Sequence, residues 1–219
     1  MKNPLSVFKD KRELLDPSIF DNEVAHKTSW EPLVGGGTNI CTHRVQTTTS
    51  PYSEKLLCFK KTAAAIFFCG SMILIGTLFL VNFSSYEGPE AWIGLVIVLI
   101  GAWQLWSMHA QQSVFDRSAR RLTKGGKTHD LGQICAIQLI REFVSGNKSS
   151  YYSYELNLVR TDGERINIAD HGSLHAIRVD AETLSNYLSI PVWDAIDYRI
   201  PEQARELDLK HEFMRRNII

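Results

Sequence analysis

Two long uncharged segments, separated by a short polar link, dominate the hydrophobic pattern of the chain. The first runs from Thr62 to Val81 and the second from Ala91 to Ala110, and each contains 20 residues. A helix of 20 residues is about 30 Å long, which matches the thickness of the hydrocarbon core of a bilayer. The link NFSSYEGPE contains the helix-breaking pair Gly88-Pro89 and is short. The pattern therefore predicts an antiparallel transmembrane hairpin.

Basic residues flank both segments but do not occur in the link between them. Lys55, Lys60 and Lys61 precede the first segment, and the link carries only Glu87 and Glu90. Five more basic residues follow the second segment: Arg117, Arg120, Arg121, Lys124 and Lys127. Because Lys and Arg accumulate on the cytoplasmic side of membrane proteins, both long flanks and both termini are predicted to be cytoplasmic. The alternative for the same pattern is the buried helical hairpin of a soluble protein.

Short β-strands are predicted after Ala110. Gly125-Gly126, between two lysines, favours a tight hairpin turn, and Asp162-Gly163 favours a second one. Residues 134–141 are largely apolar at both alternating sets of positions, which indicates a strand buried on both faces. These signals predict an antiparallel meander of about four or five strands.

A helical pattern follows the predicted strands. Five apolar residues recur at spacings of three or four: Leu174, Ile177, Ala181, Leu184 and Leu188. Ser173 is a suitable N-cap, and Pro191 prevents the helix from continuing. An antiparallel sheet covered by one helix is a small α+β domain.

A run of sequence directly after the second apolar segment has the form V-F-D-R-x-x-x-x-L-T-x-G-G, from Val114 to Gly126. With the preceding hairpin, the strands and the terminal helix, it resembles bacterial membrane proteins that carry a pleckstrin-homology-like domain. The resemblance covers roughly residues 60–193. It implies a partly open antiparallel β-barrel capped by a C-terminal helix, in a protein of the bacterial inner membrane. Members of this group mostly lack an assigned reaction.

The pattern divides the chain into four parts. Residues 1–54 are predicted to form a mostly irregular cytoplasmic arm, and residues 55–112 the membrane hairpin. Residues 113–196 are predicted to form the cytoplasmic β-rich domain, and residues 197–219 a helical tail. In the arm, Gly35-Gly36-Gly37 stands next to Thr38 and Asn39 and is a possible backbone nest for an anion. Without a P-loop lysine, the arm is instead expected to pack on the C-terminal domain or on another subunit.

Composition and motifs argue against several classes of function. The 24 Lys and Arg balance 24 Asp and Glu, which disfavours a nonspecific nucleic-acid binder. The four cysteines are widely spaced, so neither a zinc site nor a disulfide framework is predicted. His171 and His175 have metal-chelating spacing, but Gly172 places His171 before the helix. No G-x-S-x-G nucleophile motif occurs. We therefore expect no catalytic residues, no metal and no cofactor.

The candidate binding residues are the basic cluster after the second apolar segment, namely Arg117, Arg120, Arg121, Lys124 and Lys127. Anionic lipids attract such residues, although the same charges are also sufficient to set the topology alone. The leading hypothesis is a noncatalytic, membrane-anchored interaction module that contacts lipid and binds a protein partner, a second copy of itself or a larger membrane complex. The alternative is a lipid- or solute-directed enzyme or transport subunit, for which Arg120, Arg121, Asp170 and His171 are the residues to test first.

Overall fold

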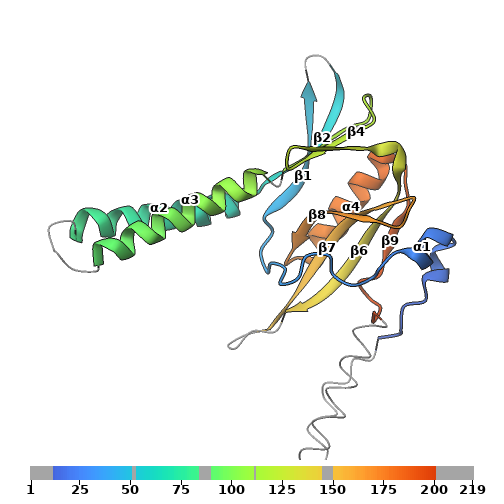
Figure 1. The fold of residues 1–219 in the computed structure, drawn as a ribbon, viewed down its shortest axis with the longest axis horizontal. Helices are drawn as coiled ribbons and strands as arrows, with labels where there is room; N and C mark the ends of the chain where they lie inside the picture. The colour runs from blue at the N-terminus through green and yellow to red at the C-terminus, as the bar shows by residue number, and fades with distance from the viewer. Residues whose placement is uncertain (1–11, 51–52, 84–89, 111, 145–149, 201–219) are drawn as a thin grey trace, which may run out of the picture.

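Two long helices form a hairpin that extends away from the rest of the chain in the computed structural model (Figure 1). The structure describes residues 12–50, 53–83, 90–110, 112–144 and 150–200. Helix α2 spans Ala63–Phe83 and helix α3 spans Glu90–Ala110, and both are long and apolar enough to cross a membrane. Only 17% and 11% of their apolar windows are buried. A helix in the core of a soluble protein buries its apolar side chains, whereas these two leave most of theirs uncovered.

Glycines bring the two helices of the hairpin into close contact. A Cβ atom added to Gly76 would lie 2.8 Å from the carbonyl oxygen of Gly94, and the reverse distance is the same. Gly101 faces the Cys69 carbonyl oxygen equally directly, at 3.2 Å from an added Cβ. Gly70 has open space around it, so the close packing depends on Gly76, Gly94 and Gly101.

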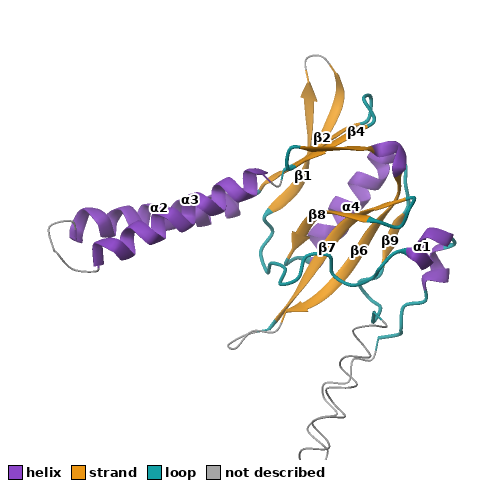
Figure 2. Cartoon of the chain, in the orientation of Figure 1, coloured by secondary structure: helices purple, strands orange, loops and turns teal. Residues whose placement is uncertain are grey.

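The strands form two separate sheets (Figure 2). The first has the order β1-β2-β3-β4-β5, and the second has the order β8-β7-β6-β9. The strands of the first sheet are His43–Ser50, Ser53–Lys61, Ser113–Asp116, Arg121–Lys124 and Lys127–Asp130. Those of the second, in chain order from β6 to β9, are Ile134–Val144, Tyr151–Arg160, Arg165–His171 and Val192–Asp194. All pairings are antiparallel except that of β6 with β9.

The predicted α+β class with antiparallel strands is confirmed, and the strands form two sheets and not a closed barrel. The 3-10 turn η3, Leu131–Gln133, separates β5 from β6 and directs the chain from the first sheet into the second. The Asp130 side chain fixes this turn by accepting a hydrogen bond from the Gly132 amide at 2.8 Å. The predicted turns at Gly125-Gly126 and Asp162-Gly163 are present, and both glycines of the first have positive φ.

The hairpin is inserted between two neighbouring strands of the first sheet. β2 precedes α2 and β3 follows α3, and the two strands pair directly, with Leu57 opposite Phe115. The α+β domain therefore begins before the hairpin, and β1 and β2 belong to it. The predicted boundaries at residues 54 and 112 assigned β1 to the arm and most of β2 to the hairpin, because strands that pair across a 51-residue insertion leave no local signal. The predicted helix within residues 197–219 lies almost entirely outside the described residues.

Helix α4, Leu174–Leu188, has Ser173 as its N-cap, as predicted, and the Ser173 hydroxyl accepts a hydrogen bond from the Ala176 amide. Its apolar face packs into the main core between the two sheets, together with residues such as Phe59, Phe115 and Leu156. Pro191 stands between the helix and β9, where a helix cannot continue.

The N-terminal arm covers the other face of the second sheet (Figure 1). It contains the short helices η2, Pro17–Phe20, and α1, Glu23–Lys27. Phe20 stacks on Trp30 with ring centroids 5.0 Å apart, and both rings lie against Trp193 of β9. The predicted packing of the arm on the C-terminal domain is thus confirmed.

Candidate functional site

The glycine-rich segment of the arm is held on the second sheet by two carboxylates. Glu155 accepts hydrogen bonds from the backbone amides of Leu33 and Val34 at 2.9 and 2.6 Å. Glu142 accepts from the amides of Gly36 and Gly37 at 2.8 and 3.0 Å. The backbone amides that the sequence suggested as an anion nest are therefore satisfied by the protein's own carboxylates.

Polar contacts also join the base of the hairpin to the domain. His43 of β1 donates from Nε2 to the carbonyl oxygen of Met108 at 2.9 Å, and Lys61 donates to the carbonyl oxygen of Leu105 at 3.0 Å. These carbonyls lie in the last turns of α3. Hydrogen-bond donors satisfy unpaired carbonyl groups at a helix C-terminus, and cations interact favourably with the helix dipole there. Burial lowers the pKa of His43, so the imidazole is neutral and its Nδ1 faces the Thr42 hydroxyl.

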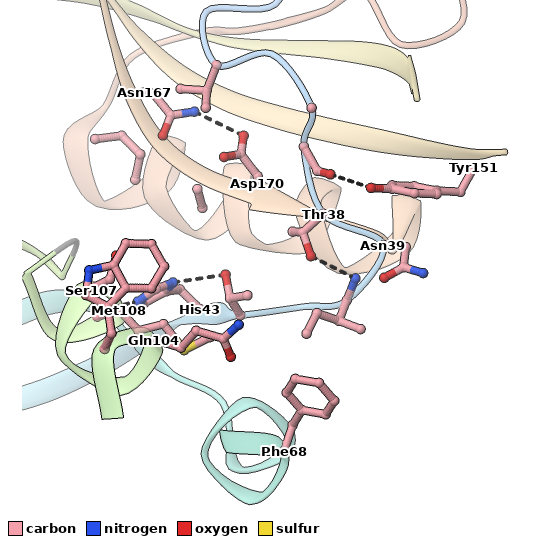
Figure 3. A pocket seen from close by; sticks show the side chains of 18 residues that line it. Thr38, Asn39, His43, Phe68, Gln104, Ser107, Met108, Tyr151, Asn167 and Asp170 are labelled. Carbon is pink, nitrogen blue, oxygen red and sulfur yellow. Dashed lines mark hydrogen bonds between the residues drawn. The ribbon is translucent and has the colours of Figure 1, made fainter. Parts of the chain in front are cut away.

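A cavity of about 450 Å³ lies where the arm, the hairpin base and the second sheet meet (Figure 3). The arm contributes a wall that includes Thr38 and Asn39, and β8 contributes Asn167 and Asp170. The opposite wall comes from the hairpin: Phe68 of α2 and, from the last turns of α3, Trp103, Gln104, Ser107 and Met108. The domain side of the cavity carries its acidic group, Asp170, and the hairpin side combines the apolar Phe68, Trp103 and Met108 with the polar Gln104 and Ser107.

Asp170 is the acidic group of this cavity. Its neighbour across the sheet is Glu155, and its hydrogen bond in the described chain comes from the Asn167 side-chain amide at 3.1 Å (Figure 3). Burial, followed by repulsion from Glu155, raises the pKa of Asp170 to about 6. At pH 7 the group is thus mostly ionised, in a place that disfavours the charge.

Lys124 comes from the first sheet and turns inward beside the same strand. Its ammonium group donates to the Asn167 backbone carbonyl and, at 3.5 Å, to that of Ile168, which satisfies the open edge of β8. Burial lowers the pKa of Lys124 to about 8, although Asp170 and Glu155 counteract the effect. The lysine is therefore a connection between the sheets and not a surface charge.

The structure disperses the basic cluster predicted from the sequence. Arg121 and Lys127 are exposed on β4 and β5, whereas Lys124 is turned inward. Arg117 and Arg120 line a separate hollow of about 340 Å³ beside Leu188, near the C-terminal end of α4. Asp170 and His171 precede the N-terminus of this helix, which at 15 residues is about 22 Å long. The four residues proposed for a catalytic alternative therefore do not meet in one place.

A buried chain of polar groups links the arm, β8 and α4. The Cys41 sulfur lies 3.2 Å from His171 Nδ1, His171 Nε2 lies 3.5 Å from Asp180, and Arg44 pairs with Asp180 at 2.9 Å. The order resembles a Cys-His-Asp triad, but burial raises the pKa of Cys41 to about 11 and lowers that of His171 to about 4. The thiol holds its proton far more tightly than the imidazole can, which opposes thiolate formation. The chain therefore fits a structural role.

The described residues were also compared with the requirements of metal sites and disulfide bonds. Within the part of the chain that is described, no group of three or more His, Cys, Asp or Glu side chains is placed to hold a metal ion. All four cysteines are free thiols. Comparison with known protein families and with curated protein sequences finds no match for this chain.

The sequence did not reveal the cavity, because its lining comes from three distant segments. Only one local signal pointed to it, the polar pair Asn167 and Asp170 in a β-strand whose neighbours are apolar. Regular alternation would place residues three apart on opposite faces of the strand. The register shift between the pairs Asn157–Asn167 and Leu156–Ala169 interrupts this alternation, so both residues line the same cavity.

Replacing Asp170 by asparagine is expected to stabilise the purified protein in detergent at neutral pH. The pKa of Asp170 is 3.8 when unperturbed and about 6 in the fold, so the native state binds the proton more tightly. The resulting penalty is absent below pH 4, grows between pH 4 and 6, and is complete above pH 6. At pH 7.5 the free energy of unfolding of Asp170→Asn should therefore exceed that of the parent by roughly 1–3 kcal/mol. The variant should accordingly melt at a higher temperature.

Thermal unfolding of both proteins in detergent between pH 4 and 8 measures this difference. The matched control is Asp162→Asn, at an exposed turn. The difference in melting temperature between this variant and the parent should not grow between pH 4 and 6 as it does for Asp170→Asn. A difference for Asp170→Asn that stays constant from pH 4 to 8 contradicts a raised pKa.

Proposed function

We propose that the protein is a noncatalytic, membrane-anchored interaction module of the bacterial inner membrane. In this proposal α2 and α3 cross the bilayer as a hairpin, and both soluble flanks are cytoplasmic. The α+β domain then lies at the membrane surface, where it binds a protein partner or a second copy, or stabilises a larger membrane complex. The pleckstrin-homology-like identity suggested by the sequence is a further part of the proposal.

The observation that carries this proposal is the contrast between the surface of the hairpin and its base. Phe67, Trp92 and Val81 are 69–79% exposed on the helices, an arrangement that water disfavours and lipid favours. At the base, by contrast, His43 and Lys61 hold α3 to the domain through hydrogen bonds. The helices therefore suit a bilayer, while the domain is held close to its surface.

Charge supports the cytoplasmic orientation. Lys60 and Lys61 end β2 at the base of α2, and basic residues continue beyond α3, whereas Glu87 and Glu90 are the charged residues of the connecting link. This distribution follows the positive-inside rule for a hairpin with its base in the cytoplasm.

Membrane extraction and cysteine labelling test the anchor and its orientation. The protein should stay in the membrane fraction after carbonate treatment. With Ser84→Cys in the link, a membrane-impermeant maleimide should label intact spheroplasts, whereas Thr161→Cys, at the exposed turn after β7, should require lysis. Release by carbonate, or labelling of Thr161→Cys from outside, contradicts the proposed topology.

Crosslinking in intact membranes tests the interaction role. A specific partner, or a second copy, should be crosslinked in stoichiometric amounts and identified by mass spectrometry. Arg121→Glu combined with Lys127→Glu reverses two exposed charges, and Glu182→Lys on the outer face of α4 is a control charge reversal. Loss of the crosslink in the first variant alone would place docking on β4 and β5. No reproducible crosslink to any protein, including a second copy, counts against an interaction module.

A further inference from the structure

The cavity at the hairpin base places an acidic group of the domain opposite large apolar side chains of the hairpin. Phe68 lies five residues from the start of α2, and Trp103 lies seven residues from the end of α3, so both are in the half of the hairpin nearer its base. Trp103 is 63% exposed and Phe68 is 50% exposed. If the hairpin crosses a bilayer, as in the proposed function, these rings are at the depth where acyl chains meet headgroups.

The polar wall favours a cation. Three carboxylates face this side of the second sheet, but Glu142 and Glu155 each accept two backbone amides from the arm. Asp170 accepts only the Asn167 amide among the described residues. Lys124 contributes a nearby positive charge, but its ammonium donates to the backbone carbonyls of Asn167 and Ile168 and to the Asn167 side-chain oxygen. The cavity is thus lined by the Asp170 carboxylate, whose ionised form is destabilised by burial.

The other groups that line the cavity suit the polar and apolar parts of an amphiphilic molecule that carries a cation. His43 is neutral and fully engaged, by Met108 and Thr42, so it adds no competing charge. Gln104 and Ser107 of α3 are side-chain donors on the side nearest the lipid. They suit a phosphate oxygen, while the aromatic rings suit methylene groups and the face of an ammonium group.

We propose that this cavity binds a phospholipid whose headgroup ends in a primary ammonium, as in phosphatidylethanolamine. The ammonium group donates to the Asp170 carboxylate, the phosphate lies beside Gln104 and Ser107, and the acyl chains run along Phe68 and Trp103. The proposal rests on the membrane hairpin of the proposed function and specifies the lipid that contacts it. Occupation by the ammonium group offsets the unfavourable charge on Asp170.

Native mass spectrometry of the full chain in detergent tests this binding. The protein is mixed in separate samples with phosphatidylethanolamine, phosphatidylglycerol or phosphatidylcholine of the same acyl chains. We expect one phosphatidylethanolamine to be retained at least about tenfold better than either other lipid, because only a primary ammonium gives a compact charge-assisted hydrogen bond. Equal retention of the three lipids overturns the proposal.

Two variants assign the binding to the cavity. Asp170→Asn keeps the size of the side chain but removes its charge, and should lower phosphatidylethanolamine retention about tenfold or more, to the level of phosphatidylglycerol. Asp162→Asn, at the exposed turn, should leave retention unchanged. Retention by Asp170→Asn equal to that of the parent overturns the assignment, and the thermal unfolding described above shows independently whether this variant is folded.

Free phosphoethanolamine distinguishes a lipid from a soluble amine. It should not displace the bound lipid at equal concentration, because it lacks the chains that contact Phe68 and Trp103. Phe68→Ala should therefore weaken lipid retention. Displacement by free phosphoethanolamine, or unchanged retention in Phe68→Ala, would overturn the lipid assignment. Carbonate extraction is independent of this result: a protein that stays in the membrane but shows no headgroup preference contradicts only this inference.

Discussion

Replacing Gly172 by alanine is expected to detach the N-terminal arm from the end of β8 and to destabilise the soluble domain strongly. A Cβ atom at Gly172 would collide with the backbone of Asn39, including its Cα at 2.6 Å. Backbone atoms cannot move aside as a flexible side chain does, so residues 38–41 must shift. Overpacking of this kind costs about 3 kcal/mol or more at the upper end of its usual range.

The shift would also disturb contacts on both sides of Asn39. The Gly172 amide donates to the Ile40 carbonyl, and Ser153 donates to the Thr38 carbonyl at 3.1 Å. Cys41, one residue further, contacts His171. We therefore expect thermal unfolding of the full chain in detergent to occur about 10 °C lower for Gly172→Ala. Limited trypsin digestion should also cut the arm at Lys27 or Arg44 much faster than in the parent.

Gly35→Ala is the matched control, because it makes the same chemical change in the same arm. No atom lies within 4 Å of a Cβ added at Gly35, so its melting temperature and digestion should match those of the parent. If Gly172→Ala unfolds at the parent temperature, the arm does not pack against β8 as described.

Replacing Gly94 by valine is expected to separate the two helices of the hairpin. A Cβ atom at Gly94 would lie 2.8 Å from the Gly76 carbonyl oxygen and 2.9 Å from the Leu80 amide nitrogen, both backbone atoms of α2. Two rigid helices can relieve this overlap only by moving apart. Helix pairs in membranes depend on close packing at small residues, so the loss of association should be about 1–3 kcal/mol or more.

Disulfide crosslinking within the hairpin measures this separation. The Cys69 sulfur lies 3.6 Å from the Gln104 side-chain oxygen, so the two side chains meet across the helices, and Gln104→Cys places a second thiol on the facing helix. Oxidation in membranes should join the two cysteines rapidly in the parent background and several-fold more slowly with Gly94→Val. Gly70→Val, which meets no atom within 4 Å, should leave the rate unchanged. Equal rates in Gly94→Val and Gly70→Val would show that these glycines do not set the helix spacing.

Two assignments show how far sequence reasoning about the site reaches. Asp170 was named from the sequence only beside His171, as a residue to test for the catalytic alternative, and the cavity that it lines was not predicted. Lys124 was assigned to a basic surface cluster, but the pairing of Lys124 with Ser113 brings it beside β8, where its ammonium finds backbone carbonyls. A turn lysine looks exposed in the sequence because the strand that it will contact is 40 residues away.

The sequence by itself determined the features that depend on local periodicity and on residue chemistry. The two apolar helices, the turns at Gly125-Gly126 and Asp162-Gly163, and helix α4 with its Ser173 cap all follow from neighbours within a few positions. Each is stabilised mainly by contacts along the chain, so each leaves a readable pattern.

Only the tertiary structure decided how distant segments meet. It divided the strands into two sheets, paired β2 with β3 across the hairpin, and placed the arm's amides on Glu142 and Glu155. It also enclosed the cavity beside Asp170 between the arm and α3. The physical reason is that these contacts join residues 40 to 130 positions apart, whose mutual fit is set by packing and by hydrogen bonding of buried groups and not by local pattern.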